Sequence, residues 1–184
     1  MLIFSRINKE SMANLVVLYG ASETGKTTFL RSLADYYKSL GLEVRGILSP
    51  AVFHEGKKVG IKVQDIHTGE ERYLAARRPV KIPRLNGKLN FVFDETVVNW
   101  GRTVLRHSVP TEVFIVDEIG PLELKKGRGW KEAIGQIMLQ QYTLGIVVLR
   151  ESLHDMVRDH WPVTEWLKYH EDLNVNSFDH YFHH

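Results

Sequence analysis

The chain has 184 residues, of which 43% are hydrophobic and 25% charged, and its formal net charge is +2. This size and composition are typical of one globular domain with a sizeable core, and so small a charge does not indicate a nucleic-acid partner. The sequence contains no cysteine, which excludes disulfide bonds and thiolate metal sites. No apolar run approaches the roughly 18–20 residues that cross a bilayer, so we expect a cytoplasmic protein without a membrane partner.

The first distinctive segment is YGASETGKTTFL, at residues 19–30. Gly20 and Gly25, followed directly by Lys26 and Thr27, have the spacing of a phosphate-binding P-loop. Glycine permits backbone conformations that turn consecutive N–H groups toward an anion, and the following helix adds its unpaired N-terminal N–H groups. We expect Lys26 to reach the β- and γ-phosphates and the Thr27 hydroxyl to bind Mg²⁺. The candidate nucleotide-binding residues are Gly20, Ala21, Ser22, Glu23, Thr24, Gly25, Lys26, Thr27 and Thr28.

The flanking segments supply the context that a P-loop needs. NLVVLY, at residues 14–19, is a short apolar run typical of a buried parallel strand. TTFLRSLADYYKSLG, at residues 27–41, has apolar residues at helical spacing and ends in glycine. The alternative is a glycine-rich turn that caps a helix and binds nothing, and the strand–loop–helix context favours the phosphate-binding interpretation.

Two basic features farther along the chain have more than one interpretation. Six basic residues and no acidic residue occur from Arg72 to Lys88, where prolines and a glycine predict a loop. That loop is either a solvated surface loop or a basic flap that approaches the triphosphate or another polyanion. Arg45, which precedes Gly46, either contacts phosphate or has a structural role, and the structural role is favoured.

Two later segments, residues 91–108 and 130–142, predict helices that pack against the sheet, because their apolar residues recur at near-helical spacing. Each segment contains a tryptophan, Trp100 in the first and Trp130 in the second. We interpret both as core or rim residues rather than as platforms on which a base stacks. The side chains of the second segment that are expected to face the core are Ile134, Ile137 and Met138.

The segment TEVFIVDEIGPLEL, at residues 111–124, supplies the acidic groups that a P-loop enzyme requires. Residues 113–116 predict another buried strand, and Asp117 follows at its carboxyl end, the edge of a parallel sheet where the P-loop also lies. We expect Asp117 to organise Mg²⁺ beside Thr27 and Glu118 to orient or deprotonate the attacking water. The alternative is a turn at which both carboxylates meet solvent. A glutamate directly after the aspartate favours hydrolysis, because the nucleophile is then water.

The last part of the chain adds one further candidate, Arg150. It follows the core-type strand predicted at 146–149, where its guanidinium either contacts the γ-phosphate or pairs at the surface with Glu151 or Asp155. The segment 151–184 is expected to form a C-terminal helix and a tail. The histidines of this segment are interpreted as part of the tail rather than as a metal site. They are His170, His180, His183 and His184.

The two motifs together resemble the THEP1-type nucleoside-triphosphatases, a family of small P-loop proteins. The resemblance is carried by YGASETGKTTFL at 19–30 and VDEIGPLEL at 116–124, and residues 42–77 are similar to the family's middle section. It implies a RecA-like core and slow, Mg²⁺-dependent hydrolysis of several nucleoside triphosphates with little base selectivity. Glu23 departs from the family pattern, in which many members have proline or a second glycine in the loop. The segment after Arg150 follows no family pattern.

We therefore predict one domain over residues 1–184, with its core at about 13–150. The predicted fold is an α/β P-loop NTPase with a mostly parallel sheet, flanking helices and a β-hairpin insertion after the first helix. The predicted activity is Mg²⁺-dependent hydrolysis of nucleoside triphosphates. Two alternatives stay open: a kinase that transfers the γ-phosphate to a small molecule or a nucleic-acid end, and a nucleotide-dependent switch or binding protein. The sequence identifies no protein partner. The expected catalytic residues are Lys26, Glu118 and Arg150, and the expected metal ligands are Thr27 and Asp117.

Overall fold

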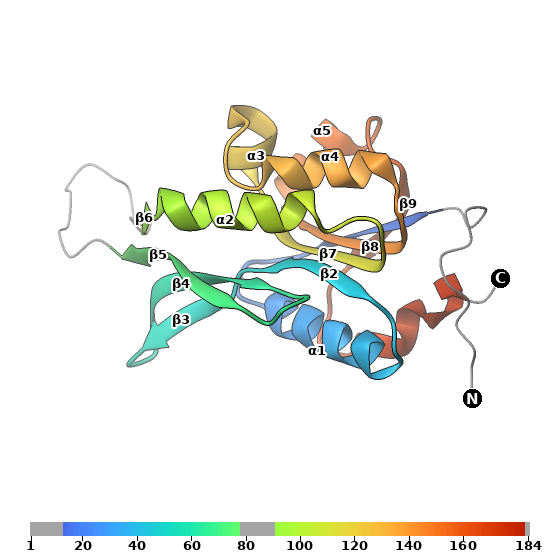
Figure 1. Cartoon of the computed structure of the whole chain (residues 1–184), viewed down its shortest axis with the longest axis horizontal. Coiled ribbons are helices and arrows are strands. Elements are labelled where there is room, and N and C mark those ends of the chain that lie inside the picture. Colours follow the sequence, from blue (N-terminus) through green and yellow to red (C-terminus); the bar gives the residue numbers. More distant parts are fainter. Residues whose placement is uncertain (1–12, 78–90, 183–184) are drawn as a thin grey trace.

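The computed structural model describes residues 13–77 and 91–182. Within them, nine strands form one sheet in the order β6-β5-β4-β2-β7-β8-β1-β9, with β3 paired to β4. Helices cover both faces of this sheet, which gives three layers (Figure 1). The α/β fold with flanking helices is confirmed. The sheet is mixed, because a parallel part and an antiparallel part meet between β2 and β4.

The parallel part of the sheet contains the predicted core strands. β7 lies between β2 and β8, and β1 lies between β8 and β9. Their interior residues are almost wholly buried, as the apolar runs at 14–19, 113–116 and 146–149 predict. One strand, β8, therefore separates the P-loop strand from the strand that carries Asp117. The bounds are β1 (Asn14–Tyr19), β2 (Val44–Leu48), β7 (Thr111–Ile119), β8 (Tyr142–Leu149) and β9 (Val163–Lys168).

The antiparallel part contains the predicted hairpin insertion. β3 and β4 form the hairpin, β4 also pairs with β2 and β5, and β6 pairs with β5. The prediction of a loop over 72–88 is wrong for its first residues, since Arg72 and Arg77 belong to the ladder of β5. The rest of that predicted loop lies outside the described residues. The bounds are β3 (Ala51–His54), β4 (Lys57–Asp65), β5 (Glu71–Arg77) and β6 (Phe91–Phe93).

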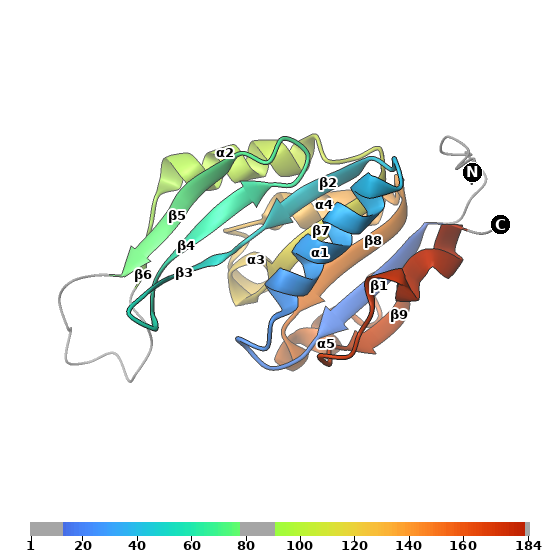
Figure 2. The same cartoon turned by 90° about the horizontal axis from the view of Figure 1, so that it is seen from below.

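Helices on the two faces build two hydrophobic cores. One face is covered by α1, which buries Leu30, Leu33 and Tyr37 against the parallel strands (Figure 2). The opposite face is covered by α2, α3 and α4, and there Leu105 and Ile137 are fully buried. The bounds are α1 (Lys26–Ser39), α2 (Glu95–Arg106), α3 (Pro121–Lys126) and α4 (Lys131–Leu139).

The structure corrects details of the two predicted packing helices. The segment 91–108 begins as β6, and Asp94 then caps α2, because its carboxylate accepts two backbone N–H groups of the first turn at 2.9 and 3.4 Å. In the segment 130–142, Met138 is 48% exposed instead of facing the core. Tyr142 already belongs to β8.

The largest correction concerns the C-terminal segment, for which the sequence predicts a helix and a tail. Instead, two short helices are followed by β9, which adds a parallel strand beside β1, and by the 3-10 helix η2, which packs on α1. Phe178 of η2 is fully buried, and the Tyr36 hydroxyl donates to Asp179 at 2.7 Å. Tertiary packing, rather than local propensity, decides this structure. The remaining bounds are η1 (Glu151–Leu153), α5 (His154–Val157) and η2 (Val175–Phe182).

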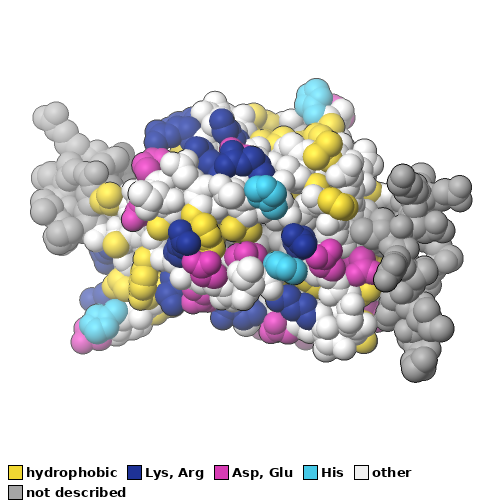
Figure 3. All heavy atoms as spheres, in the orientation of Figure 1, with side chains coloured by type: hydrophobic (Ala, Val, Ile, Leu, Met, Phe, Trp, Pro, Cys, Tyr) yellow, Lys and Arg dark blue, Asp and Glu magenta, His cyan; other side chains and the backbone are white. Residues whose placement is uncertain are grey.

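The surface of the described residues carries both signs of charge. On the face seen in Figure 3, Lys and Arg side chains are interspersed with Asp and Glu side chains. Several charged side chains of the described residues form ion pairs, such as Lys62 with Glu71 at 2.9 Å and Arg72 with Glu70 at 2.8 Å. Exposed pairs of this kind contribute little to stability. Within the described part of the chain, no helix is long and apolar enough to span a membrane.

Candidate functional site

The P-loop, residues 20–25, connects the end of β1 to the start of α1. Gly20 has a φ of 154° and Gly25 a φ of 97°, which are values that glycine adopts readily. Gly25 also caps α1, where the Phe29 N–H donates to the Gly25 carbonyl oxygen at 2.9 Å. A Cβ atom on Gly25 would lie 3.2 Å from the Tyr169 hydroxyl. Any other residue at this position would therefore be both strained and crowded.

The Lys26 amine is folded against the inside of this loop. Its Nζ donates to the carbonyl oxygen of Gly20 at 3.2 Å, to that of Ala21, and to the hydroxyl of Thr24 at 3.3 Å. Burial lowers the pKa of Lys26, whereas the carboxylates at 117–118 raise it. The loop thus holds a cation close to the N-terminus of α1, which is an arrangement that suits a polyanion.

Asp117 and Thr27 are brought together as the sequence predicts. Asp117 is only 4% exposed, and its Oδ2 accepts the backbone N–H of Ser49 at 2.9 Å. Burial raises the pKa of Asp117, while hydrogen bonds from the Ser49 N–H and the Thr27 hydroxyl lower it. Burial therefore removes the carboxylate from water, and the hydrogen bonds compensate for only part of the lost hydration.

The oxygen atoms of Thr27 and Asp117 fit a magnesium ion. Mg²⁺ prefers hard oxygen ligands and is usually held by one or two carboxylates, with water and phosphate oxygens in the other positions. The buried carboxylate of Asp117 lies against the hydroxyl of Thr27, which is a donor set of this kind. Among the described residues, no group of three or more His, Cys, Asp or Glu side chains forms a metal cage. Binding at this site would thus depend on phosphate oxygens as well.

A bulge in β7 sets the direction of Glu118. Val116 pairs with Val147 of β8, but the pair that follows is Ile119 with Leu149, so β7 has two residues where β8 has one. Glu118 has a φ of 66°, an uncommon value for a residue with a side chain. In a regular strand, residues 117 and 118 would point to opposite faces. Here both line the same hollow.

Arg150 lies at the end of β8, beside this bulge. Its Nε donates to Oε1 of Glu118, and the two side chains are 55% and 37% exposed, respectively. Neither of the two roles considered for Arg150 from the sequence includes an ion pair with Glu118. The two residues are 32 positions apart in the chain, so no local pattern indicates the contact. The ion pair holds the Glu118 carboxylate at the mouth of the hollow.

These groups surround a hollow of about 620 Å³, which we call the phosphate hollow. The predicted residues from 22 to 28 line it, together with Asp117, Glu118 and Arg150. Gly20 and Ala21 are not among its lining residues, and their carbonyl oxygens accept from the Lys26 amine instead. Glu23 is exposed at the rim and has a φ of 62°.

Sequence reasoning missed several residues of the phosphate hollow. Ser49 directly follows the buried strand β2, and its backbone N–H donates to Asp117. The sequence feature that could have indicated this residue is a hydroxyl side chain directly after an apolar run. Arg31 of α1 and Lys58 of β4 add positive charge to the wall. Arg31 also donates to Gln64 at 3.3 Å, a contact between distant segments that no local pattern encodes.

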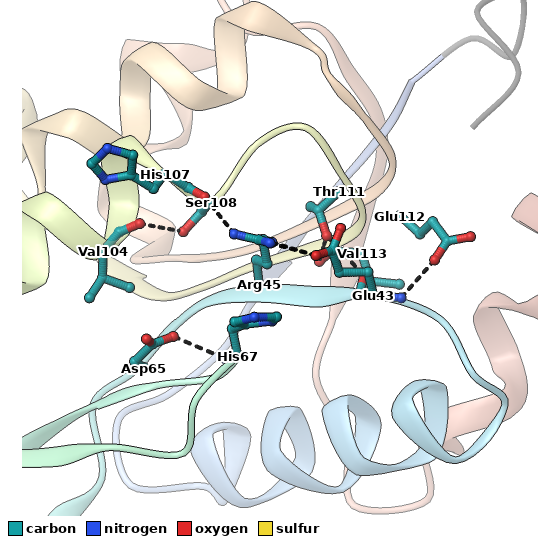
Figure 4. Close-up of polar contacts among 10 residues, drawn as sticks. All are labelled: Glu43, Arg45, Asp65, His67, Val104, His107, Ser108, Thr111, Glu112 and Val113. Carbon is teal, nitrogen blue, oxygen red and sulfur yellow. Dashed lines mark hydrogen bonds and ion pairs between the residues drawn. The ribbon is translucent and has the colours of Figure 1, made fainter. Parts of the chain in front are cut away.

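Arg45 lies apart from the phosphate hollow and has the favoured structural role. Its guanidinium donates to Oε1 of Glu43, at 2.9 Å from Nε and 2.6 Å from Nη2, and to the carbonyl oxygen of His107 at 3.1 Å (Figure 4). These contacts join the start of β2 to the end of α2. Arg45 is not among the residues that line the phosphate hollow.

The tryptophans and the described histidines also lie away from the phosphate hollow. Trp130 is buried in the core, and Trp100 packs against that core with the guanidinium of Arg72 at 4.3 Å from its ring centroid. This confirms that both are core or rim residues. His170 and His180 are exposed, and the other two predicted tail histidines lie outside the described residues.

Glu123, the second glutamate of the VDEIGPLEL motif, has a structural role. It is buried, and its carboxylate accepts the backbone N–H of Gly120 at 2.8 Å and that of Trp130 at 3.0 Å. A Cβ atom on Gly129 would lie 1.9 Å from Glu123 Oε1. The carboxylate thus connects the start of α3 to the start of α4, directly after the bulge.

A P-loop between the first parallel strand and its helix, with an acidic pair at the end of another parallel strand, defines a P-loop NTPase. A family model described as NTPase matches residues 15–176. The nucleoside-triphosphatase THEP1 of Methanopyrus kandleri is 33% identical over 149 residues, which cover 80% of each chain. That of Methanothermobacter thermautotrophicus is 31% identical and covers 77% of this chain and 79% of its own. The chain therefore belongs to this NTPase family, the family of the THEP1 nucleoside-triphosphatases.

Solved structures agree on the fold. The solution structure of a human cancer-related nucleoside triphosphatase superposes with a TM-score of 0.66 at 23% identity, over 90% of this chain and 93% of that one. The crystal structure of THEP1 from Aquifex aeolicus gives a TM-score of 0.52 at 17% identity, over 84% and 88%.

Proposed function

We propose that the chain hydrolyses nucleoside triphosphates to the diphosphate and phosphate, with Mg²⁺ and with several bases accepted. The observation that carries this proposal is the bulge in β7, because it places two adjacent carboxylates in the hollow that contains Lys26. Family membership and the names of the relatives support the same activity.

In this proposal, the P-loop and Lys26 bind the phosphates. Loop N–H groups and the N-terminus of α1 surround the phosphate oxygens, and the Lys26 amine exchanges neutral carbonyl acceptors for charged oxygens. Hydrogen bonds between charged partners are shorter and stronger, so this exchange favours the bound state. Thr27 and Asp117 hold Mg²⁺, whose charge neutralises the triphosphate and offsets the burial of the aspartate.

Glu118 is the residue that we assign to the attacking water. Its carboxylate accepts a hydrogen bond from water and directs the oxygen toward the γ-phosphorus. The water oxygen forms a bond to the γ-phosphorus and its proton passes to the Glu118 carboxylate. The bond between that phosphorus and the bridging oxygen breaks, and the nucleoside diphosphate leaves with the bridging oxygen. Arg150 positions Glu118 through their ion pair. None of these groups needs to contact the base, which is consistent with several bases being accepted.

The experiment is phosphate release from ATP, GTP, CTP and UTP, with Mg²⁺ or with EDTA, by the wild type and by Glu118→Gln. We expect turnover of several triphosphates with Mg²⁺ only, and a loss of about a hundredfold or more in the variant. Nucleotide affinity should be retained, because glutamine fills the same space without acting as a base.

The matched control is Glu151→Gln, the same substitution at an exposed residue beside Arg150. It should leave turnover unchanged. Tight nucleotide binding without phosphate release by the wild type would overturn the hydrolase proposal. In that case, release that begins only with an added phosphate acceptor would indicate a kinase, and release that begins only with a protein partner would indicate a switch.

A further inference from the structure

A second hollow, of about 630 Å³, lies on the other side of the P-loop, between α1 and the segment 169–175. Three residues of the loop and the first helical turn line both hollows: Thr24, Gly25 and Thr28. The two hollows therefore meet on the P-loop. Asp117, Glu118 and Arg150 line only the phosphate hollow.

The position of these groups gives a direction to a bound triphosphate, provided that the proposed function holds. In a P-loop, the lysine and the metal ligands mark the β- and γ-phosphates, and the loop N–H groups continue to the α-phosphate. The γ-end therefore lies beside Asp117. The α-end, to which the ribose is attached, lies toward Thr28 and the second hollow.

The walls of the second hollow suit a flat group with polar edges. The Tyr169 ring stands 5.7 Å from the Phe29 ring, and the Tyr169 N–H donates to the Tyr19 carbonyl oxygen at 2.7 Å, which fixes this wall to the end of β1. Leu173 and Val175 add apolar surface. The volume is in the usual range for small-molecule sites, roughly 300–1,000 Å³.

The polar rim comes from the same C-terminal segment. Glu171 and Asp172 are exposed at the hollow, and their carboxylates accept hydrogen bonds only. Ribose hydroxyls and the amino groups of bases are donors that match such acceptors. The aromatic wall favours bases with a larger flat face.

We propose that this second hollow is the nucleoside site, in which the ribose and base lie between α1 and residues 169–175. The segment after β9 is then the part of the chain that contacts the base. Purine nucleotides bind more tightly than pyrimidine nucleotides, while inorganic tripolyphosphate occupies the phosphate hollow alone.

Ser32→Trp tests this proposal, because Ser32 is an exposed α1 residue that lines only the second hollow. Affinities for the imido analogue of ATP and for tripolyphosphate, both with Mg²⁺, are measured by calorimetry. We expect the variant to lose about tenfold or more in affinity for the analogue and to stay within about twofold for tripolyphosphate. Asp35→Trp, an exposed α1 position outside the hollow, is the matched control and should change neither affinity.

A second variant, Tyr169→Leu, keeps an apolar wall but removes the aromatic ring. It should lower the affinity for the purine analogue and reduce its advantage over the imido analogue of UTP. Unchanged analogue affinity in Ser32→Trp, or an equal loss for both ligands, would overturn the nucleoside site. These binding data are independent of phosphate release. If the protein does not hydrolyse nucleotides but Ser32→Trp still weakens binding of the analogue and not of tripolyphosphate, the result contradicts only the proposed function.

Discussion

The two sides of the P-loop are built from different parts of the sheet. The side with Asp117 and Arg150 consists of the ends of β7 and β8, which are paired with strands on both edges and are almost wholly buried. The other side consists of β9 and the segment after it, where β9 pairs with β1 and its residues are only partly buried. The chemistry proposed here thus lies on the rigid centre of the sheet.

This difference predicts that the protein positions the phosphates of a nucleotide more rigidly than the nucleoside. Groups in the centre of a sheet are held by the strands around them, which suits residues that must stay within a fraction of an ångström of their working positions. The second side rests on β1 through β9, and on α1 through η2, where the aromatic residues Phe178 and Tyr181 are buried. Changes there are expected to alter binding or stability before they alter chemistry.

The largest effect is expected on the first side, from Asp117→Asn. Removing the charge that we propose to organise Mg²⁺ should lower turnover by about a thousandfold, or about 4 kcal/mol in the activation free energy. The fold should survive, because the asparagine carbonyl can still accept the Ser49 N–H and a neutral amide is less costly to bury than a carboxylate. Phosphate release and a thermal melt measure the two quantities.

The same substitution at Asp155, whose side chain is 96% exposed, is the control and should change neither quantity. If Asp117→Asn instead unfolds the protein, the carboxylate has a structural role. If turnover falls by less than about tenfold, the metal has other ligands.

A smaller effect, on stability, is expected on the second side from Phe178→Ala. Phe178 is 1% exposed and packs near the Phe29 ring at 6.3 Å, so the truncation should cost about 3 kcal/mol of unfolding free energy. Phe53→Ala removes the same group from a residue that is 58% exposed and should cost little. Urea unfolding compares the two variants. Equal costs would show that η2 does not contribute to the core.

The sequence predicted the first side far better than the second. The strands at 14–19, 113–116 and 146–149 are almost uniformly apolar, a pattern that is typical of fully buried parallel strands. The P-loop motif then predicts the loop between the first strand and its helix. Asp117 then follows from its place at the end of a core strand. In these cases, the local pattern and the tertiary environment agree.

The remaining features depend on contacts that no local pattern contains. The bulge at Glu118 has no glycine to mark it, and its positive φ exists only because β8 is one residue shorter at that point. The segment 163–168 mixes exposed and half-buried positions, so its strand structure depends on the open edge of β1. Tyr169 reaches the P-loop only because β9 lies beside β1.

The smallest effect concerns the contact between the central strands, the ion pair of Arg150 with Glu118. Both side chains are partly exposed, so Arg150→Gln should change the unfolding free energy by less than about 1 kcal/mol. Turnover should fall by about tenfold with KM nearly unchanged, because Glu118 loses the contact that directs it while the phosphates keep theirs. Steady-state kinetics and a thermal melt test both statements.

The double variant Arg150→Gln, Glu118→Gln decides how Arg150 acts. If Arg150 works through Glu118, adding its substitution to Glu118→Gln should cost almost nothing more, because the group that it positions is already inactive. A full additional tenfold loss, or a raised KM in Arg150→Gln alone, would mean that the guanidinium contacts the γ-phosphate itself. The ion pair between β7 and β8 would then be an arrangement of the nucleotide-free protein that opens when the substrate binds.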